Sequence, residues 1–221
     1  YNSLKDMSEY GFGPVKSGWE SYYYAHKNVN NRDYHSYIDY NDSSSGRSSW
    51  AKWWGSDWIR CGLPGYTNGG GDDLTMCLSG LPDFKTNQSS NVGIPEILKT
   101  KWNKEGTYNT KVSKYGSSNT VTGYLSDWLA EWVREFGVDG FRCDTAKHVE
   151  LQSWNTLKQK CVKALKEWKA ANPDKKLDDL DFWMTGECFG HKAEKSQYFT
   201  SGGFDSMINF SFQGNENKSG S

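Results

Sequence analysis

Residues 121–143 read VTGYLSDWLAEWVREFGVDGFRC, and this stretch decides the fold. Apolar side chains recur in its first part at intervals of three and four residues, which is the spacing of one face of an α-helix. Gly137 fits a helix C-cap, because glycine adopts the left-handed conformation without a steric cost. We expect a short strand directly after it, over residues 138–143. The apolar positions of the helix are Leu125, Trp128, Leu129, Trp132, Val133 and Phe136.

The same order of elements continues toward the C-terminus. A second helix is expected from Leu151, and Asn172-Pro173 ends it because proline cannot continue a helix. A strand over 182–187, a short helix around 194–199 and a third strand over 204–210 follow. Alternating helices and strands imply parallel strands, so the sequence predicts an α/β fold, either a doubly wound sheet or a (β/α)8 barrel. The apolar face of the second helix comprises Leu151, Trp154, Cys161, Ala164, Leu165 and Trp168.

Residues 1–120 have a different character. Asn, Ser, Gly, Tyr and Trp dominate, and turn-forming clusters stand at 28–31, 41–46 and 68–71. We expect loops and short strands there, with one short helix over about 49–59, where four tryptophans recur at near-helical spacing. The chain is therefore divided into an irregular part, 1–120, and an α/β part, 121–221.

Composition excludes some functions. The 26 Lys and Arg residues balance 27 Asp and Glu residues, which leaves no excess of basic side chains for nucleic-acid binding. We therefore expect no nucleic-acid partner. No apolar run approaches the ~18 residues of a membrane span, so we also expect no membrane insertion.

Five cysteines leave at least one thiol unpaired within the chain. Cys61 and Cys77 are candidates for a disulfide or for free thiols, whereas Cys143 and Cys161 lie on apolar faces and are expected to be buried.

Two carboxylates close to predicted strand ends carry the chemistry. Side chains alternate along the strand that ends at Asp144, so Arg142 and Asp144 share one face while Phe141 and Cys143 share the other. Glu187 ends the next strand, and carboxyls on neighbouring strand ends can lie at the ~5–5.5 Å that retaining glycoside hydrolysis uses. A structural Arg–Asp pair and a solvated loop acid would give the same pattern.

Three motifs resemble signature regions of the α-amylase family, glycoside hydrolase family 13. DGFRCDTAKH at 139–148 is similar to the second region, Gly186-Glu187 to the third, and LPDFKTN at 81–87 to a further region near the end of the inserted domain B. They occur in the order of the family. Residues 53–210 resemble in particular its periplasmic members in bacteria, which implies a periplasmic or extracellular location.

The resemblance implies an endo-acting α-1,4-glucan hydrolase of the retaining type that acts on starch or malto-oligosaccharides. Asp144 corresponds to the nucleophile and Glu187 to the general acid/base. Arg142 would orient Asp144 and keep it charged. Lys147 and His148 match a pair that binds the glucan on its aglycone side.

A structural calcium ion (Ca²⁺) is also implied. Asp83 and the backbone carbonyl of His148 match two ligand positions, and Asp72 or Asp73 is expected to supply another oxygen. Oxygen ligands suit this hard cation. Cys188 and His191 have the spacing of a metal pair, but no second pair accompanies them, so we expect no metal there.

The first and fourth regions of the family are not found in this sequence. The resemblance therefore implies a partial (β/α)8 barrel, about strands 4–6, preceded by a loop-rich domain B over 1–120, with the remainder of the barrel supplied by flanking sequence. Alternatives are a non-catalytic amylase-like glucan-binding protein, a transglycosylase and an exo-acting glucosidase. The 221 residues alone are expected to be inactive.

Overall fold

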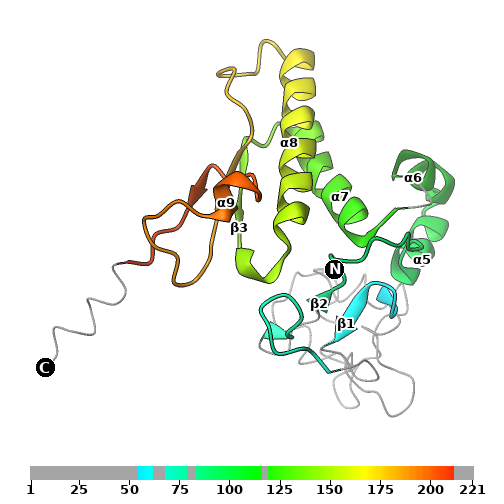
Figure 1. The fold of residues 1–221 in the computed structure, drawn as a ribbon. Coiled ribbons are helices and arrows are strands. Elements are labelled where there is room, and N and C mark those ends of the chain that lie inside the picture. Colours follow the sequence, from blue (N-terminus) through cyan, green and yellow to red (C-terminus); the bar gives the residue numbers. More distant parts are fainter. Residues whose placement is uncertain (1–53, 62–67, 79–82, 116–118, 212–221) are drawn as a thin grey trace, which may run out of the picture. The chain divides into compact units, whose positions relative to one another are not determined.

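The computed structural model describes residues 54–61, 68–78, 83–115 and 119–211 (Figure 1). The chain forms two compact units. The first comprises Tyr1–Gly71, Thr75–Lys85 and Asn91–Asn119. The second comprises Asp72–Leu74, Thr86–Ser90 and Thr120–Ser221, so that two short segments from the irregular half belong to the unit that carries the α/β elements.

The first unit contains a small antiparallel pair of strands. β1 (Ile59–Cys61) pairs with β2 (Asp83–Phe84), with Ile59 opposite Phe84. Cys61 and Cys77 form a disulfide, which decides between the two states that the sequence left open. Trp58 is buried at the start of β1, and its indole nitrogen donates to the carbonyl of Gly93 at 2.8 Å.

Two helices in the first unit contradict the expectation of loops and short strands. They are α5 (Glu96–Lys104) and α6 (Tyr108–Tyr115). Charged residues interrupt any apolar stripe along α5, so the periodicity is weak, yet Trp102 is buried and Lys101 pairs with Glu105 at 2.7 Å. The helix expected over 49–59 is wrong in its second half, because the chain turns after Trp54 and enters β1 at Ile59. Residues 49–53 lie outside the described part.

The second unit confirms the alternating order. A sheet of three parallel strands runs in the order β3-β4-β5, with Cys143 opposite Gly186 and Gly186 opposite Met207. It is an open sheet of α/β type and not a closed barrel. Within the described ranges no helix combines the length and the apolar character that a membrane span requires. The elements are α7 (Val121–Phe136), β3 (Gly140–Cys143), the 3₁₀ turn η2 (Ala146–His148), α8 (Leu151–Ala171), β4 (Trp183–Gly186), α9 (Gln197–Thr200) and β5 (Ser206–Met207).

Helix α7 begins and ends as the sequence indicates, but it buries a different face. The hydroxyl of Thr120 caps its start by accepting from the amide of Gly123 at 3.0 Å, and Gly137 ends it with φ +67°. Leu129, Trp132 and Phe136, which the apolar spacing placed on the buried stripe, are 41%, 59% and 58% exposed. The buried positions of α7 are instead Val121, Gly123, Tyr124, Ser126, Ala130 and Val133.

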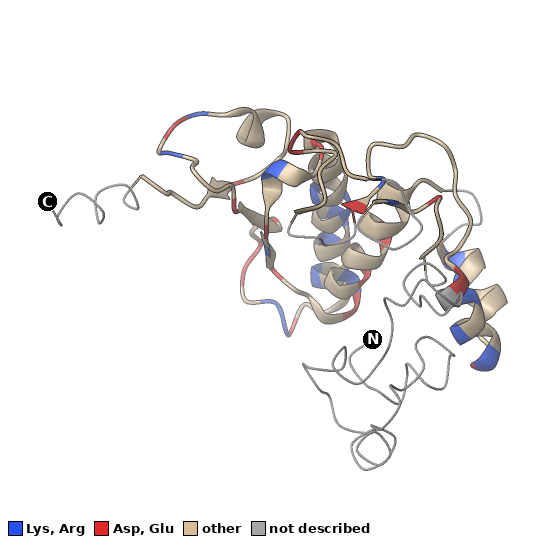
Figure 2. Ribbon diagram, turned by 90° about the horizontal axis from the view of Figure 1, so that it is seen from below, with Lys and Arg blue, Asp and Glu red and all other residues tan. Residues whose placement is uncertain are grey.

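The buried face of α7 packs against α8. The two helices lie side by side (Figure 1), and Ala130 of α7 and Ala164 of α8 belong to the same buried core. Small side chains allow the helix axes to approach closely, which large indole rings at the same positions would prevent. Charged positions recur along both helices (Figure 2), and Lys160 of α8 pairs with Asp127 of α7 at 2.6 Å.

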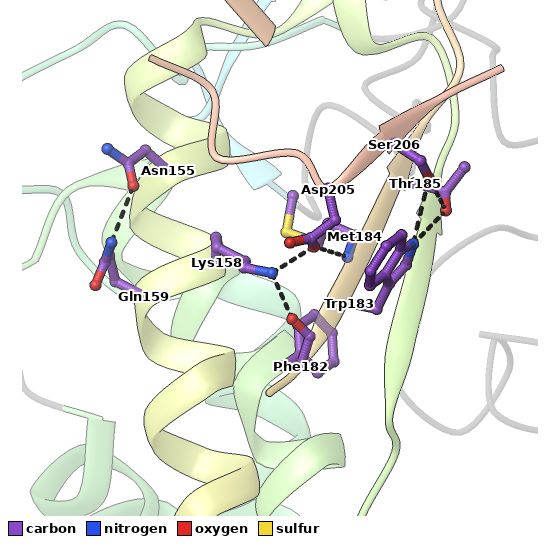
Figure 3. Close-up of polar contacts among 9 residues, drawn as sticks. All are labelled: Asn155, Lys158, Gln159, Phe182, Trp183, Met184, Thr185, Asp205 and Ser206. Atoms are coloured by element: carbon purple, nitrogen blue, oxygen red, sulfur yellow. Dashed lines mark hydrogen bonds and ion pairs between the residues drawn. The ribbon is translucent and has the colours of Figure 1, made fainter. Parts of the chain in front are cut away.

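A polar contact holds the sheet to α8 where the strands begin (Figure 3). Lys158 of α8 donates to the carbonyl of Phe182 and to the carboxylate of Asp205. Asp205 also accepts from the amide of Met184 at 2.7 Å. Because these contacts lie just before or at the start of β4 and β5, the opposite, carboxyl ends of the strands are left for the predicted site residues.

Candidate active site

Backbone pairing places Asp144 and Glu187 directly after neighbouring parallel strands. The ladder continues beyond β3 and β4, because the amide of Glu187 donates to the carbonyl of Cys143 at 2.8 Å. The amide of Ala146 then donates to the carbonyl of Glu187 at 2.6 Å. Both carboxylates therefore leave the sheet at the same edge, as the strand register predicts.

Arg142 joins the two carboxylates. Its Nη2 atom lies 2.8 Å from Oε2 of Glu187, and its Nη1 atom lies 3.5 Å from Oδ2 of Asp144. Phe141 and Cys143 on the opposite face pack in or against the core, so the alternation of side chains along β3 is confirmed. The guanidinium is close to both acids, and Glu187 is its nearer partner.

The surroundings of Asp144 lower the pKa of its carboxyl group. A hydrogen bond with the side chain of Glu187 is the largest cause that lowers the pKa of Asp144. Burial, the next largest cause, acts against it, and the charge of Arg142 lowers the pKa further. The lowered pKa favours the anionic form of Asp144, which a nucleophile requires.

Thr145 has a backbone conformation that its sequence context does not signal. It is the only non-glycine residue with a positive φ in the described part of the chain, at +48°. Its carbonyl accepts from the amide of His148 at 2.9 Å, which forms the turn η2, and the indole of Trp154 donates to the carbonyl of Ala146 at 2.9 Å. Lys147 and His148 are the last two residues of this turn.

Lys147 and His148 both contact Asp73. The ammonium of Lys147 lies 3.1 Å from Oδ1 of Asp73, and Nδ1 of His148 lies 2.7 Å from the backbone carbonyl of the same residue. Asp73 stands in a segment that belongs to the second unit, Asp72–Leu74. Of the predicted site residues, the structure thus brings together Asp144, Glu187 and Arg142 in one group, and Lys147, His148 and Asp73 in another.

The residues expected to hold calcium have protein partners. Oδ2 of Asp83 accepts from Nε of Arg60 at 2.6 Å in the first unit, and Asp73 faces Lys147. No group of three His, Cys, Asp or Glu side chains suited to a metal ion is found among the described residues. A carboxylate has about four lone-pair sites, so oxygen atoms of both acids can still serve a cation beside these partners.

Cys188 and His191, which have the spacing of a metal pair, lie in a packed cluster. His191 is buried, its Nε2 atom lies 2.9 Å from the hydroxyl of Ser196, and its ring packs edge to face on Tyr198. The thiol of Cys188 lies 3.4 Å from the hydroxyl of Tyr198. Burial, the contact with Cys188 and the charge of Asp73 raise the pKa of Tyr198, in that order of size.

Two features of the site escape the sequence. Nothing in the local pattern indicates the left-handed backbone of Thr145, because threonine rarely adopts it. The contact of Asp73 with His148 joins residues 75 positions apart. The sequence had singled out Asp72 and Asp73 only as candidate calcium ligands, in a stretch that resembles the family.

Comparisons with known proteins agree with the motifs. Residues 111–221 match the family described as "Alpha amylase, catalytic domain". The chain is 46% identical over 220 residues to the periplasmic alpha-amylase of Escherichia coli K12, covering 96% of this chain and 31% of that protein. An alpha-amylase of Streptomyces lividans is 36% identical over 94 residues, 42% of this chain and 9% of its own length.

Among solved structures, an Anoxybacillus alpha-amylase is 27% identical and covers 44% of this chain and 19% of its own, with a TM-score of 0.33. That score is too low to demonstrate a shared fold. The chain spans less than a third of the length of the Escherichia coli relative.

Proposed function

Because this chain belongs to the α-amylase family, we propose that it is part of an endo-acting α-1,4-glucan hydrolase that cleaves starch and malto-oligosaccharides with retention of configuration. We call the complete enzyme, with the rest of the barrel, the parent enzyme. One observation carries the proposal: Arg142 contacts two carboxylates that follow neighbouring parallel strands. A protein that only binds glucan has no need of an anion and an acid at adjoining strand ends.

The two carboxyls have complementary roles in this mechanism. Asp144, kept as an anion, attacks the anomeric carbon while Glu187 donates its proton to the departing glycosidic oxygen. Glu187, now a carboxylate, then takes a proton from water, whose oxygen attacks the same carbon and releases Asp144. Two inversions give net retention. Arg142 holds both acids in place and stabilises the anionic one through its charge.

The surroundings of the site support further parts of the proposal. Lys147 and His148 follow Asp144 in one turn, and the proposal assigns them to the aglycone side of the glucan. The disulfide between Cys61 and Cys77 supports a periplasmic or extracellular location, since such bonds persist in oxidising compartments. The Escherichia coli relative is named as periplasmic.

Calcium binding is part of the same proposal. Asp83 and the carbonyl of His148 would supply oxygen atoms, which suit a hard cation, although Arg60 already neutralises Asp83. Asp72 or Asp73 is the candidate for a further oxygen, and the chelator experiment described below tests Asp73. The ion would stabilise the folded parent enzyme by binding only to it. No catalytic step depends on it.

The anomer of the first product tests the mechanism. The parent enzyme is mixed with maltoheptaose, and proton NMR follows the newly formed reducing ends before they mutarotate. We expect the α-anomer first, because two displacements at one carbon restore the configuration. Asp144→Asn and Glu187→Gln serve as controls that should lose at least about 10³-fold in turnover with an unchanged melting temperature. Initial β-anomer, or normal turnover in either variant, would refute the assignment.

A further inference from the structure

Asp73 is the residue that both proposed glucan-binding side chains contact, although it comes from a distant part of the sequence. Its carboxylate faces the ammonium of Lys147 at 3.1 Å, and its backbone carbonyl lies 2.7 Å from Nδ1 of His148. A local hydrogen bond holds the segment around Asp73 in a turn, since Oδ1 of Asp72 accepts from the amide of Leu74 at 2.9 Å. Asp73 is thus held in a short turn with its two polar groups directed at successive residues of η2.

The contact with His148 determines the tautomer of the imidazole. A backbone carbonyl has no hydrogen to donate, so Nδ1 of His148 must be the donor in this bond. In the neutral ring the lone pair then lies on Nε2, which can accept a hydrogen bond from a sugar hydroxyl. The backbone of Asp73 therefore fixes both the ring orientation and the nitrogen that would meet the substrate.

The contact with Lys147 restricts the ammonium group. Lysine has a long flexible side chain, and holding it in one place before the substrate arrives reduces the entropy lost on binding. The side chains of Lys147 and Asp73 are 34% and 52% exposed, and an ion pair this open adds little to folding stability. Its effect should therefore be visible in substrate binding and almost absent from the melting temperature.

We propose that Asp73 is a positioning residue for the glucan-binding pair Lys147 and His148, with its carboxylate placing the ammonium and its carbonyl fixing the imidazole. This inference rests on the proposed function of the parent enzyme. It gives Asp73 a role other than that of a calcium ligand, and the two roles predict different results for the same substitution.

A double-mutant cycle in the parent enzyme tests the carboxylate. Asp73→Asn keeps the size of the side chain and the backbone carbonyl but removes the charge. We expect KM for maltoheptaose to rise about two- to fivefold with kcat within about twofold of wild type, as for a weak exposed ion pair. In a Lys147→Met background the same substitution should have no further effect, and Asp73→Glu should restore part of the lost affinity.

Asp179→Asn is the matched control, because Lys176 and Asp179 form another exposed Lys–Asp pair, in the connection between α8 and β4. It should leave KM unchanged. Melting temperatures of wild type and Asp73→Asn are also compared with and without a chelator. A positioning role predicts equal chelator responses, whereas a calcium ligand predicts a reduced response in the variant.

The outcomes separate the proposals. A KM rise that disappears in the Lys147→Met background, with an equal chelator response, supports the inference. An unchanged KM, an effect that persists without Lys147, or a reduced chelator response overturns it while the hydrolase remains. A parent enzyme that does not hydrolyse any α-glucan would overturn the proposed function and this inference together.

Discussion

At the scale of single residues, Arg142 sets the electrostatics of the site. Its guanidinium pairs with both acids, at 2.8 Å from Glu187 and 3.5 Å from Asp144. The hydrogen bond between the two acids and the charge of Arg142 both lower the pKa of Asp144. Because Asp144 is exposed, solvent screens this charge, so the effect should appear in the pH profile more than in the stability of the fold.

Arg142→Met should therefore shift the acid limb of the kcat/KM profile of the parent enzyme to higher pH. Loss of the guanidinium removes one cause of the lowered pKa, so Asp144 becomes protonated at a higher pH and the active anion is lost earlier as pH falls. Initial rates on maltoheptaose between pH 3 and 8 measure the shift. Arg142→Lys is the control and should shift less, since it keeps a positive charge. An acid limb that does not move would contradict this role.

At the scale of helices and strands, Gly137 decides how α7 gives way to β3. It has φ +67°, and a Cβ atom added there would lie 2.4 Å from the indole ring of Trp168 on α8. Two separate reasons thus require glycine at this position: the left-handed backbone and the close approach of a packed aromatic ring.

Gly137→Ala should lower the free energy of unfolding of the parent enzyme by about 2–4 kcal/mol, the sum of a left-handed backbone cost and an overpacking cost. Gly190→Ala is the matched control, because Gly190 has φ +87° but nothing within 4 Å of an added Cβ. It should cost about 1–2 kcal/mol, from the backbone alone. Urea denaturation of both variants measures the difference. Equal losses would mean that Trp168 moves aside without cost.

At the scale of the whole molecule, the described residues leave apolar surface uncovered. Leu129, Trp132 and Phe136 are exposed along α7, and Trp132 packs on Phe136 with ring centroids 5.5 Å apart. In the described sheet β3 and β5 each pair with β4 only, so both are edge strands. Exposed apolar stripes and unpaired strand edges are features that promote association.

The 221-residue chain by itself should therefore associate and should not hydrolyse starch. A sugar ring is held in a barrel enzyme by side chains from many strand ends, and the described part supplies three parallel strands. Light scattering and a starch assay on the purified chain, with the parent enzyme at equal concentration as the control, check both statements. A monodisperse monomer with the turnover of an amylase would contradict them.

The local sequence was sufficient for the order of the elements and for the two acids. Helical spacing and the glycine stop predicted α7, and alternation along β3 placed Arg142 and Asp144 on one face, because these patterns depend only on the periods of a helix and a strand. The parallel register then put Glu187 beside Asp144.

Tertiary structure alone decided the remaining features. Helix α7 buries Ala130 in the core that it shares with α8 and leaves Trp132 exposed, although hydrophobicity alone favours burial of the larger ring. Asp73 meets Lys147 and His148 across about 75 residues of sequence, and no local period encodes a contact between such distant segments. Periodicity determines which side chains share a face, but packing determines which face is buried and which distant residues meet there.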